Sequence, residues 1–223
     1  MIDWNQVDTV LLDMDGTLLD LHFDNHFWLE YVPARYAEAQ GISLADATEQ
    51  LTARYKSIEG SLDWYCVDHW SRELGLDIVL LKEEVDHLIA VHPHVVDFLD
   101  QLMCAGKARV LLTNAHQKTL ALKMEKTRLA GFFNQVISSH QLGLPKEHPE
   151  FWPRLQNLYP FDRQRTLFVD DSPAVLESAR QYGIRSILAI LKPDSKQPVR
   201  EASEFLSVED FSEITSGLRC LSP

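Results

Sequence analysis

The chain of 223 residues carries 33 acidic against 21 basic side chains, a formal net charge of −12, and 45% of its residues are hydrophobic. This length allows one large domain or a core with an inserted module, and the hydrophobic content is sufficient for a packed core. The acidic balance, without any lysine-rich footprint, argues against a nucleic acid polymer as partner but allows a small anionic substrate held by a metal ion and local donors.

The spacing of the cysteines and the hydropathy of the chain indicate in which cellular compartment the protein is expected. Cys66, Cys104 and Cys220 are odd in number, far apart and without a C-x-x-C pair. They indicate neither a disulfide framework nor a zinc site, so a reducing compartment is the simpler expectation. No apolar run approaches the roughly 20 residues that span a bilayer, and the N-terminus holds Asp3 and Asp8 without a basic region. We therefore expect a cytoplasmic protein with no membrane span and no signal peptide.

The first predicted strand ends in two aspartates. Residues 10–12 form an apolar run that is followed by Asp13, Asp15 and the turn signal Gly16. In α/β sheets, ligands bind at the carboxyl ends of the strands. On a regular strand the two carboxylates would share one face, where like charges repel unless a cation or a proton lies between them. The pair therefore predicts either a hard-metal site or a nucleophile beside an acid/base.

A long stretch with helical spacing and few strand signals follows the first strand. The expected helices cover residues 25–40, interrupted by Pro33, then 45–58, 62–74 and 82–90. We expect residues 21–91 to form an α-helical cap that is inserted into the chain. Residues 1–20 and 92–223 would then form the core domain.

Strands and helices alternate in the rest of the chain. Strands are expected at 109–112, 135–138, 166–169 and 185–190, and helices at 95–105, 117–128, 147–159 and 173–182. The tail from Lys192 is expected to be loop with a short helix over 208–215. This alternation predicts an α/β fold, with a Rossmann-like, mainly parallel sheet between two layers of helices.

Polar residues follow three of these later strands. They are Thr113-Asn114, then Lys146 after the loop that follows the third strand, and Asp170-Asp171 with Ser172 and Pro173 as a helix start. Taken singly, each has an ordinary explanation as a helix N-cap, a solvated lysine or acidic residues at a helix N-terminus. Beside the first acidic pair, the set suits a phosphoryl group, whose oxygens need cations and oriented donors.

These motifs, in this order, resemble those of the haloacid dehalogenase-like superfamily of aspartate-nucleophile phosphohydrolases. The resemblance covers roughly residues 7–191, and its most specific parts are Asp13-Met14-Asp15-Gly16-Thr17 and Asp170-Asp171. It implies that Asp13 is the nucleophile and that Asp15 is the general acid and then the general base.

The resemblance also implies a magnesium ion, for which Mn²⁺ substitutes well and Ca²⁺ poorly. Its ligands would be Asp13, Asp170 and the backbone carbonyl of Asp15, and Asp171 would either orient them or bind the metal itself. The phosphate group would be held by Gly16, Thr17, Thr113, the backbone N–H of Asn114, and Lys146.

More narrowly, residues 8–21, 63–66, 112–116 and 192–195 resemble the bacterial purine 5′-nucleotidases that act on GMP and IMP. This predicts a purine nucleoside monophosphate as the small-molecule substrate. Three cap aromatics, Trp64, Tyr65 and Trp70, have the spacing of either a helix core or a stacking wall for the base. Four more residues near the motifs are weaker candidates for substrate contact: Asp24, Asn25, His26 and His116.

Other functions compete with this assignment. A phosphatase of sugar phosphates or phosphoglycolate, or a phosphomutase, would keep all four motifs and differ only in the cap. A 2-haloacid dehalogenase needs neither Asp15 nor the second acidic pair, and an ion pump has threonine in place of Asp15. Outside the enzymes, a phospho-acceptor signalling domain also combines aspartates with a threonine and a lysine, but its acceptor lies on a later strand.

Overall fold

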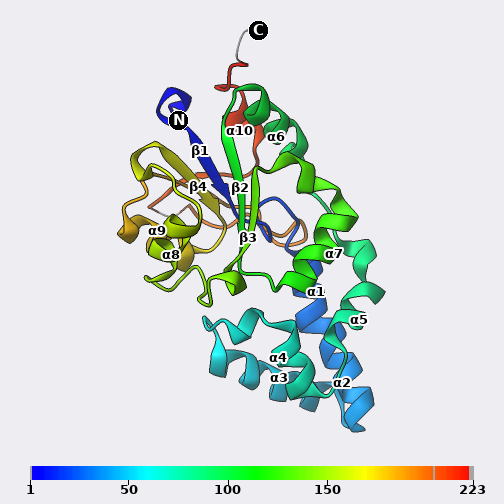
Figure 1. Cartoon of the computed structure of the whole chain (residues 1–223). Coiled ribbons are helices and arrows are strands. Elements are labelled where there is room, and N and C mark those ends of the chain that lie inside the picture. Colours follow the sequence, from blue (N-terminus) through cyan, green and yellow to red (C-terminus); the bar gives the residue numbers. More distant parts are fainter. Residues whose placement is uncertain (1, 203, 221–223) are drawn as a thin grey trace.

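The computed structural model describes residues 2–202 and 204–220, and its centre is a parallel β-sheet (Figure 1). The sheet has six strands in the order β3-β2-β1-β4-β5-β6, and every pair is parallel. Their bounds are Thr9–Leu12 (β1), Ala108–Thr113 (β2), Gln135–Ser138 (β3), Thr166–Asp170 (β4), Ser186–Ile190 (β5) and Leu206–Val208 (β6). The predicted α/β, Rossmann-like fold is confirmed.

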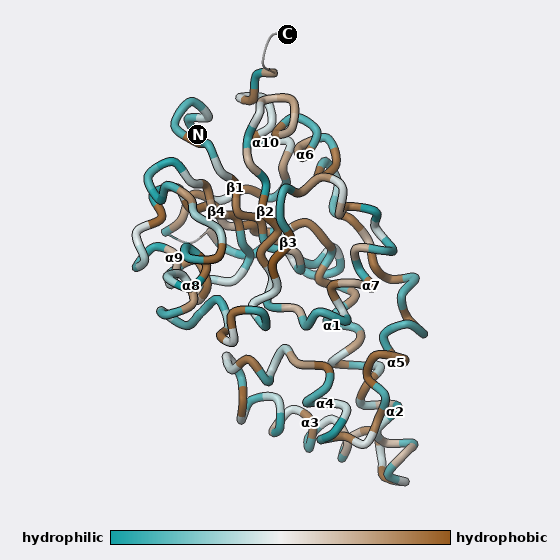
Figure 2. The backbone as a smooth tube through the Cα atoms, viewed as in Figure 1, coloured by the Kyte–Doolittle hydropathy of each residue, from teal (hydrophilic) through white to brown (hydrophobic). Residues whose placement is uncertain are grey.

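Helices cover both faces of the sheet because successive strand side chains point to opposite sides. Leu11 faces the layer of Phe151–Leu158 (α8) and Pro173–Tyr182 (α9). Val10 and Leu12 face the other layer, formed by Val95–Cys104 (α6), Gln117–Thr127 (α7) and Ser212–Thr215 (α10). The strands are consequently the most hydrophobic part of the chain (Figure 2).

Five helices between β1 and β2 lie together beyond one end of the sheet (Figure 1). They are His22–His26 (α1), Val32–Gln40 (α2), Leu44–Ile58 (α3), Val67–Leu74 (α4) and Ile78–Glu84 (α5). The two connections to this helical segment, residues 21–91, run side by side, since the N–H of Asp20 donates to the carbonyl of Ala90 at 2.9 Å and that of His92 donates to Leu18 at 2.9 Å. No helix in the described part of the chain is long and apolar enough to cross a membrane.

The helical segment differs from the sequence prediction at three places. Pro33 does not interrupt the first helix, because a π-helical turn over Phe27–Tyr31 leads into α2 and places the proline in the first turn, where its missing N–H costs little. The predicted helix 62–74 is divided at Cys66, which adopts an extended conformation and caps α4. The predicted helix 82–90 begins earlier, at Ile78, because Asp77 provides the N-cap.

Two further elements depart from the prediction. The tail contains a strand, β6, that pairs with β5 and was expected to be loop. Helix α8 begins only at Phe151, after Pro149. Short 3₁₀-helical turns occupy Trp4–Gln6, Asp63–Tyr65, Asp86–Leu88, Leu129–Phe132, Ser139–Gln141 and Arg163–Arg165.

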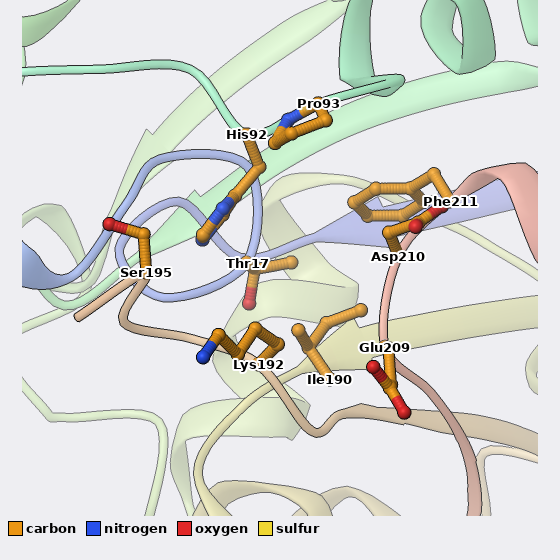
Figure 3. A pocket seen from close by; sticks show the side chains of 9 residues that line it. All are labelled: Thr17, His92, Pro93, Ile190, Lys192, Ser195, Glu209, Asp210 and Phe211. Carbon is orange, nitrogen blue, oxygen red and sulfur yellow. The ribbon is translucent and has the colours of Figure 1, made fainter. Parts of the chain in front are cut away.

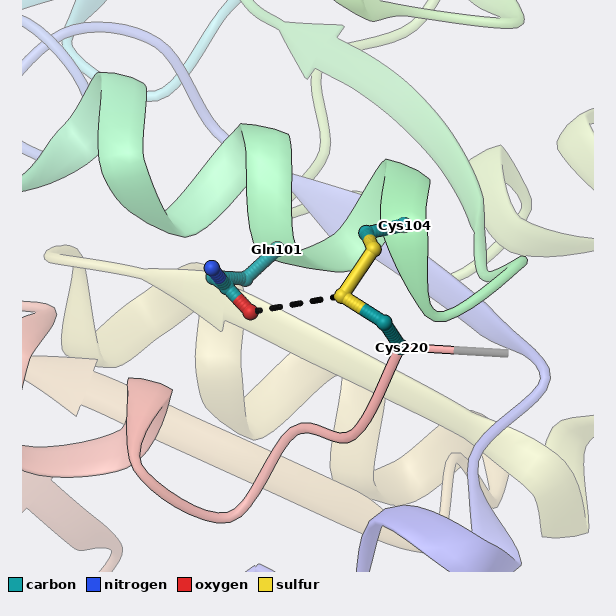
Figure 4. Close-up of a disulfide and its surroundings, with 3 residues drawn as sticks. All are labelled: Gln101, Cys104 and Cys220. Carbon is teal, nitrogen blue, oxygen red and sulfur yellow. Dashed lines mark hydrogen bonds between the residues drawn. A yellow bond between two sulfur atoms is a disulfide. The ribbon is translucent and has the colours of Figure 1, made fainter. Parts of the chain in front are cut away.

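A disulfide joins Cys104 at the end of α6 to Cys220 (Figure 4). The cysteine spacing indicated no disulfide, and this bond corrects that interpretation. Cys66 is the free cysteine of the described residues. The two cysteines are 116 residues apart in the sequence, so their spacing did not indicate that they pair. It depends on α10 packing against α6, which brings the tail beside Cys104 and Gln101.

Candidate active site

The strand register brings three motif residues to one edge of the sheet. Leu12, the last residue of β1, is level with Leu111 of β2 and Val169 of β4. The N–H of Asp13 continues this ladder by donating to the carbonyl of Val169 at 3.0 Å. Asp13, Thr113 and Asp170 therefore leave neighbouring strands at the same carboxyl edge, where ligands bind in open α/β sheets.

Lys146 joins two of the aspartates. Its Nζ lies 2.5 Å from Oδ1 of Asp13 and 2.7 Å from Oδ2 of Asp170, and it also donates to the carbonyl of Leu112 at 3.2 Å. All three side chains are buried. Burial raises the pKa of Asp13 and of Asp170 to about 6 against the opposing effect of Lys146. Burial would lower the pKa of Lys146, but the two carboxylates outweigh it and raise that pKa.

Asp171 completes an acidic group with Asp13 and Asp170. Carboxylate oxygens of the three lie within 4.8 Å of one another, and Oδ2 of Asp13 is buried without a hydrogen-bond partner among the described residues. Asp171 also pairs with Arg200 at 3.1 Å, so three carboxylates face two cations. An oxygen-rich group with an excess of negative charge and an unsatisfied buried oxygen fits a hard divalent cation.

Gly16 allows the first motif to turn against this group. Its φ is +82°, and a Cβ at this position would lie 2.7 Å from Cγ of Asp171. Any larger residue would therefore collide with Asp171 and also strain the backbone. The close approach that requires glycine here is to a carboxylate of the protein.

Asp15 is held by a second, separate charge network. Lys123 of α7 contacts Asp15 and Asp24 at 2.5 Å each, and Lys82 of α5 contacts Asp24 at 3.0 Å. Burial raises the pKa of Asp15 to about 6, with Lys123 opposing the rise. Burial would also raise the pKa of Asp24, but the two lysines outweigh it and lower that pKa to about 2. A carboxyl group with a pKa of about 6 suits acid/base work near neutral pH.

Thr113 and Asn114 line the site from the end of β2. The hydroxyl of Thr113 accepts a hydrogen bond from the N–H of Ala115 at 2.9 Å. Asn114 accepts from the N–H of Lys146 at 2.9 Å and donates to Glu147 at 2.9 Å. Glu147 in turn accepts from the hydroxyl of Tyr65 in the helical segment, so these residues join the segment to the core.

Thr17 lies apart from the other motif residues. Its hydroxyl is buried without a partner and lines a separate cavity of about 220 Å³ (Figure 3). The neighbours are His92, Lys192 and Ser195 together with residues of the β5–β6 side. We expected a donor to phosphate at this position, but the side chain does not line the pocket that holds Asp13.

One pocket of about 510 Å³ connects the acidic group to the helical segment. Asp13, Asp15, Thr113, Asn114, Lys146, Asp170 and Asp171 line one end. The far end is lined by aromatic residues, by the second half of α3 and by its C-cap, namely Trp28, Trp64, Tyr65, Trp70, Thr52, Tyr55, Lys56 and Glu59. Trp70 is only 2% exposed and packs on Tyr55 and Trp28, which makes it mainly a core residue.

The weaker candidates have different surroundings. Asp24 and Asn25 line the pocket, and Asn25 donates to Asp194 at 2.7 Å. His116 lines it too, whereas His26 pairs with Glu30 and is absent from the lining. Sequence reasoning missed Lys123, Lys82 and Arg200, because each is a single basic residue whose partner lies 29 or more positions away. Trp28 and Tyr55 had helical apolar spacing, but nothing distinguished them from core residues.

Comparison with known proteins gives the family of the chain. A family model described as haloacid dehalogenase-like hydrolase matches residues 7–183. The chain is 40% identical over 217 residues to the GMP/IMP nucleotidase YrfG of Escherichia coli, covering 97% of this chain and 98% of that protein. It is 24% identical over 217 residues to a phosphoglycolate phosphatase of Pseudomonas fluorescens, covering 93% and 78%.

Solved structures share the fold. A HAD phosphatase from Thermococcus onnurineus superposes with a TM-score of 0.79 at 21% identity, covering 94% of this chain and 97% of that one. The HAD-hydrolase YfnB from Bacillus subtilis, crystallised bound to magnesium, gives 0.61 at 21% identity, covering 94% and 97%. The family match over most of the chain, the near full-length relative and the four motifs at one sheet edge lead to one conclusion: this protein is a member of the haloacid dehalogenase-like hydrolases.

Proposed function

We propose that this hydrolase is a magnesium-dependent phosphomonoesterase that converts purine nucleoside 5′-monophosphates, GMP and IMP foremost, to nucleoside and phosphate. One observation carries the proposal: a single pocket joins the buried acidic group at the sheet edge to an aromatic and charged face of the helical segment. Its volume of about 510 Å³ is within the usual range for sites that enclose small molecules. The 40% identity to a GMP/IMP nucleotidase supports the same substrate class.

Asp13 is the proposed nucleophile. Its carboxylate attacks phosphorus, the nucleoside oxygen leaves, and the phosphoryl group is carried as an aspartyl-phosphate until water hydrolyses it. Asp15 gives its proton to the leaving oxygen and then takes one from the attacking water. Lys123, at 2.5 Å from Asp15, holds that carboxyl group in place.

Asp13, Asp170 and the backbone carbonyl of Asp15 are the proposed magnesium ligands, with Asp171 orienting them. Bound magnesium supplies positive charge that offsets the repulsion between substrate phosphate and the carboxylates. Lys146, Thr113 and the N–H of Asn114 hold phosphate oxygens. We expect activity to be lost in a chelator, restored well by Mn²⁺ and poorly by Ca²⁺, in a phosphate-release assay; full activity in the chelator would contradict the metal assignment.

The helical segment is the proposed cap that selects the substrate. Trp28 and Trp64, both partly buried, offer aromatic faces to a base. Lys56 near the end of α3 and Glu59, which follows the helix as its C-cap, also line the pocket, and their side chains make no ion pair or hydrogen bond with the residues that the structure describes. A 6-oxopurine presents an acceptor at O6 and a donor at N1, which a lysine and a glutamate satisfy, whereas adenine presents the reverse.

The decisive experiment is steady-state kinetics on a panel of monophosphates: GMP, IMP, AMP, pyrimidine nucleotides, hexose phosphates and phosphoglycolate. We expect the 6-oxopurine nucleotides to have the highest kcat/KM. Glu59→Gln should reduce the preference for GMP over AMP roughly tenfold, which corresponds to one hydrogen bond of about 1.4 kcal/mol. Thr48→Ala in α3, outside the pocket lining, is the control.

A phosphoglycolate phosphatase is the second candidate, because proteins of that name match 93% of this chain or more. A phosphatase of other sugar phosphates or a phosphomutase would share the same core residues. If phosphoglycolate or a hexose phosphate exceeds GMP by more than tenfold in kcat/KM, the nucleotidase proposal is wrong and the general phosphatase remains.

A further inference from the structure

A second cluster of metal-binding side chains lies outside the acidic group. The Sγ of Cys66 and ring nitrogens of His116 and His140 lie within 4.8 Å of one another. Cys66 belongs to the helical segment, where it caps α4. His116 precedes α7 and His140 lies in the turn after β3, so both belong to the sheet core. The cluster therefore spans the boundary between the two parts of the molecule.

His140 has a buried ring nitrogen that no other group satisfies. Its Nε2 is buried and has no hydrogen-bond partner among the residues that the structure describes. A ring nitrogen in these surroundings is available to bind a metal ion. A buried nitrogen without a partner is otherwise costly.

The other two side chains complement it. Cys66 is the thiol outside the disulfide, and its Sγ accepts one hydrogen bond from the N–H of His69, at 3.4 Å. The ring of His116 lies edge-on to that of His140, with centroids 4.9 Å apart. Nε2 of His116 is 3.8 Å from a carboxylate oxygen of Asp68, and this negative charge favours a cation beside the ring.

We propose that Cys66, His116 and His140 bind a zinc ion, with water in the fourth position. One thiolate and two imidazoles suit Zn²⁺, whereas Mg²⁺ prefers the oxygen ligands of the acidic group. Zn–S and Zn–N bonds of about 2.3 and 2.1 Å place tetrahedral ligand atoms about 3.5 Å apart, so side-chain rotations that draw the group together by about 1 Å are sufficient. When Nε2 of His116 binds the metal, Nδ1 carries the ring proton. The hydrogen bond that Nδ1 accepts from the N–H of Lys118, at 3.3 Å, is then lost.

This site would act as a clamp on the pocket. A zinc ion bound from both sides would tie α4 to the core beside His116, which lines the pocket, and would hinder its opening. The effect on turnover rests on the proposed phosphatase activity, but zinc binding itself does not. The two are therefore tested separately.

The binding test uses the full chain, with its disulfide intact and with saturating Mg²⁺ to occupy the acidic group. Co²⁺ is titrated as the zinc substitute, because a thiolate ligand adds a sulfur-to-cobalt charge-transfer band and a tetrahedral site gives intense visible bands. We expect both in the wild type, loss of the charge-transfer band in Cys66→Ser, and at least roughly tenfold weaker Zn²⁺ competition in His140→Gln. The exposed His148→Gln is the matched control and should behave as the wild type.

The turnover test adds Zn²⁺ to the magnesium-loaded enzyme. Zinc should inhibit the wild type and His148→Gln at concentrations roughly tenfold below those that inhibit Cys66→Ser. Cys66→Ser should keep its basal turnover, since Cys66 does not line the pocket, and its circular dichroism verifies the fold. A cobalt spectrum without the thiolate band, or the same band in Cys66→Ser, would overturn the site. Equal zinc inhibition of both proteins would place the inhibitory ion elsewhere and overturn the clamp.

Discussion

Asp13 has two oxygens in different circumstances: Oδ1 is paired with Lys146, and Oδ2 is buried without a partner. Asp13→Asn keeps the shape of the side chain but cannot attack phosphorus. We expect turnover to fall roughly a thousandfold or more, with a cooperative unfolding transition retained. Phosphate release under saturating magnesium and thermal unfolding measure the two effects. A variant that keeps a tenth of the activity would remove Asp13 as nucleophile.

Asp15 contacts Lys123 and is not among the three carboxylates of the acidic group. Burial raises its pKa to about 6, which suits a residue that gives and takes protons near neutral pH. Asp15→Asn should lower kcat for GMP by about 10²–10⁴-fold, because a ribose oxygen needs a proton to leave. With nitrophenyl phosphate, the rate of the first step, in which Asp13 displaces the leaving group, should fall much less, because nitrophenolate leaves without a proton. Burst kinetics on both substrates provide the measurement. Identical losses would count against the acid role.

At the scale of elements, two tryptophans that line the same pocket are expected to differ in role, one in substrate binding and the other in core packing. Trp64 is partly buried in a short turn, whereas Trp70 of α4 is 2% exposed and packs against Tyr55 and Trp28. Trp64→Ala should lower kcat/KM for GMP by roughly ten- to a hundredfold through lost stacking, with little change for a small phosphate ester. Trp70→Ala should instead reduce the free energy of unfolding by about 3–5 kcal/mol.

Kinetics on both esters and denaturant unfolding of both variants separate these roles. If Trp64→Ala slows the small ester as much as GMP, its side chain shapes the phosphate site and does not select a base. If Trp70→Ala unfolds like the wild type, the α3–α4 packing depends on other contacts.

At the scale of the whole molecule, the disulfide ties the tail to α6 across 116 residues (Figure 4). Cross-linking so long a loop restricts the unfolded chain, so reduction or Cys220→Ser should lower the free energy of unfolding by about 2–4 kcal/mol. Phosphate release should change little, since the pocket lining contains neither cysteine. Denaturant titrations with and without reductant test this, with Cys66→Ser as the control. Equal midpoints in both conditions would show that the tail is held by packing alone.

Much of the architecture could be predicted because it depends on local patterns. The strands 109–112, 135–138 and 166–169 were found within one residue at each end, since buried parallel strands are short apolar runs. The π-helical turn before Pro33 could not be predicted, because it reflects the packing of the helical segment. The strand β6 could not be predicted either, because its hydrogen-bond partners come only from β5. Neither carries a strong signal in its own residues.

The sequence by itself determined the α/β order, the parallel sheet and the identity of the motif residues, because each apolar strand and the polar residues at its end are adjacent in the sequence. The tertiary structure alone decided which charges meet. Lys123 contacts Asp15 from 108 positions away, and Cys66 meets His116 and His140 only because the helical segment lies beyond the carboxyl edge of the sheet. Such pairings depend on how separate elements pack, and the residues next to a side chain in the sequence do not indicate that packing.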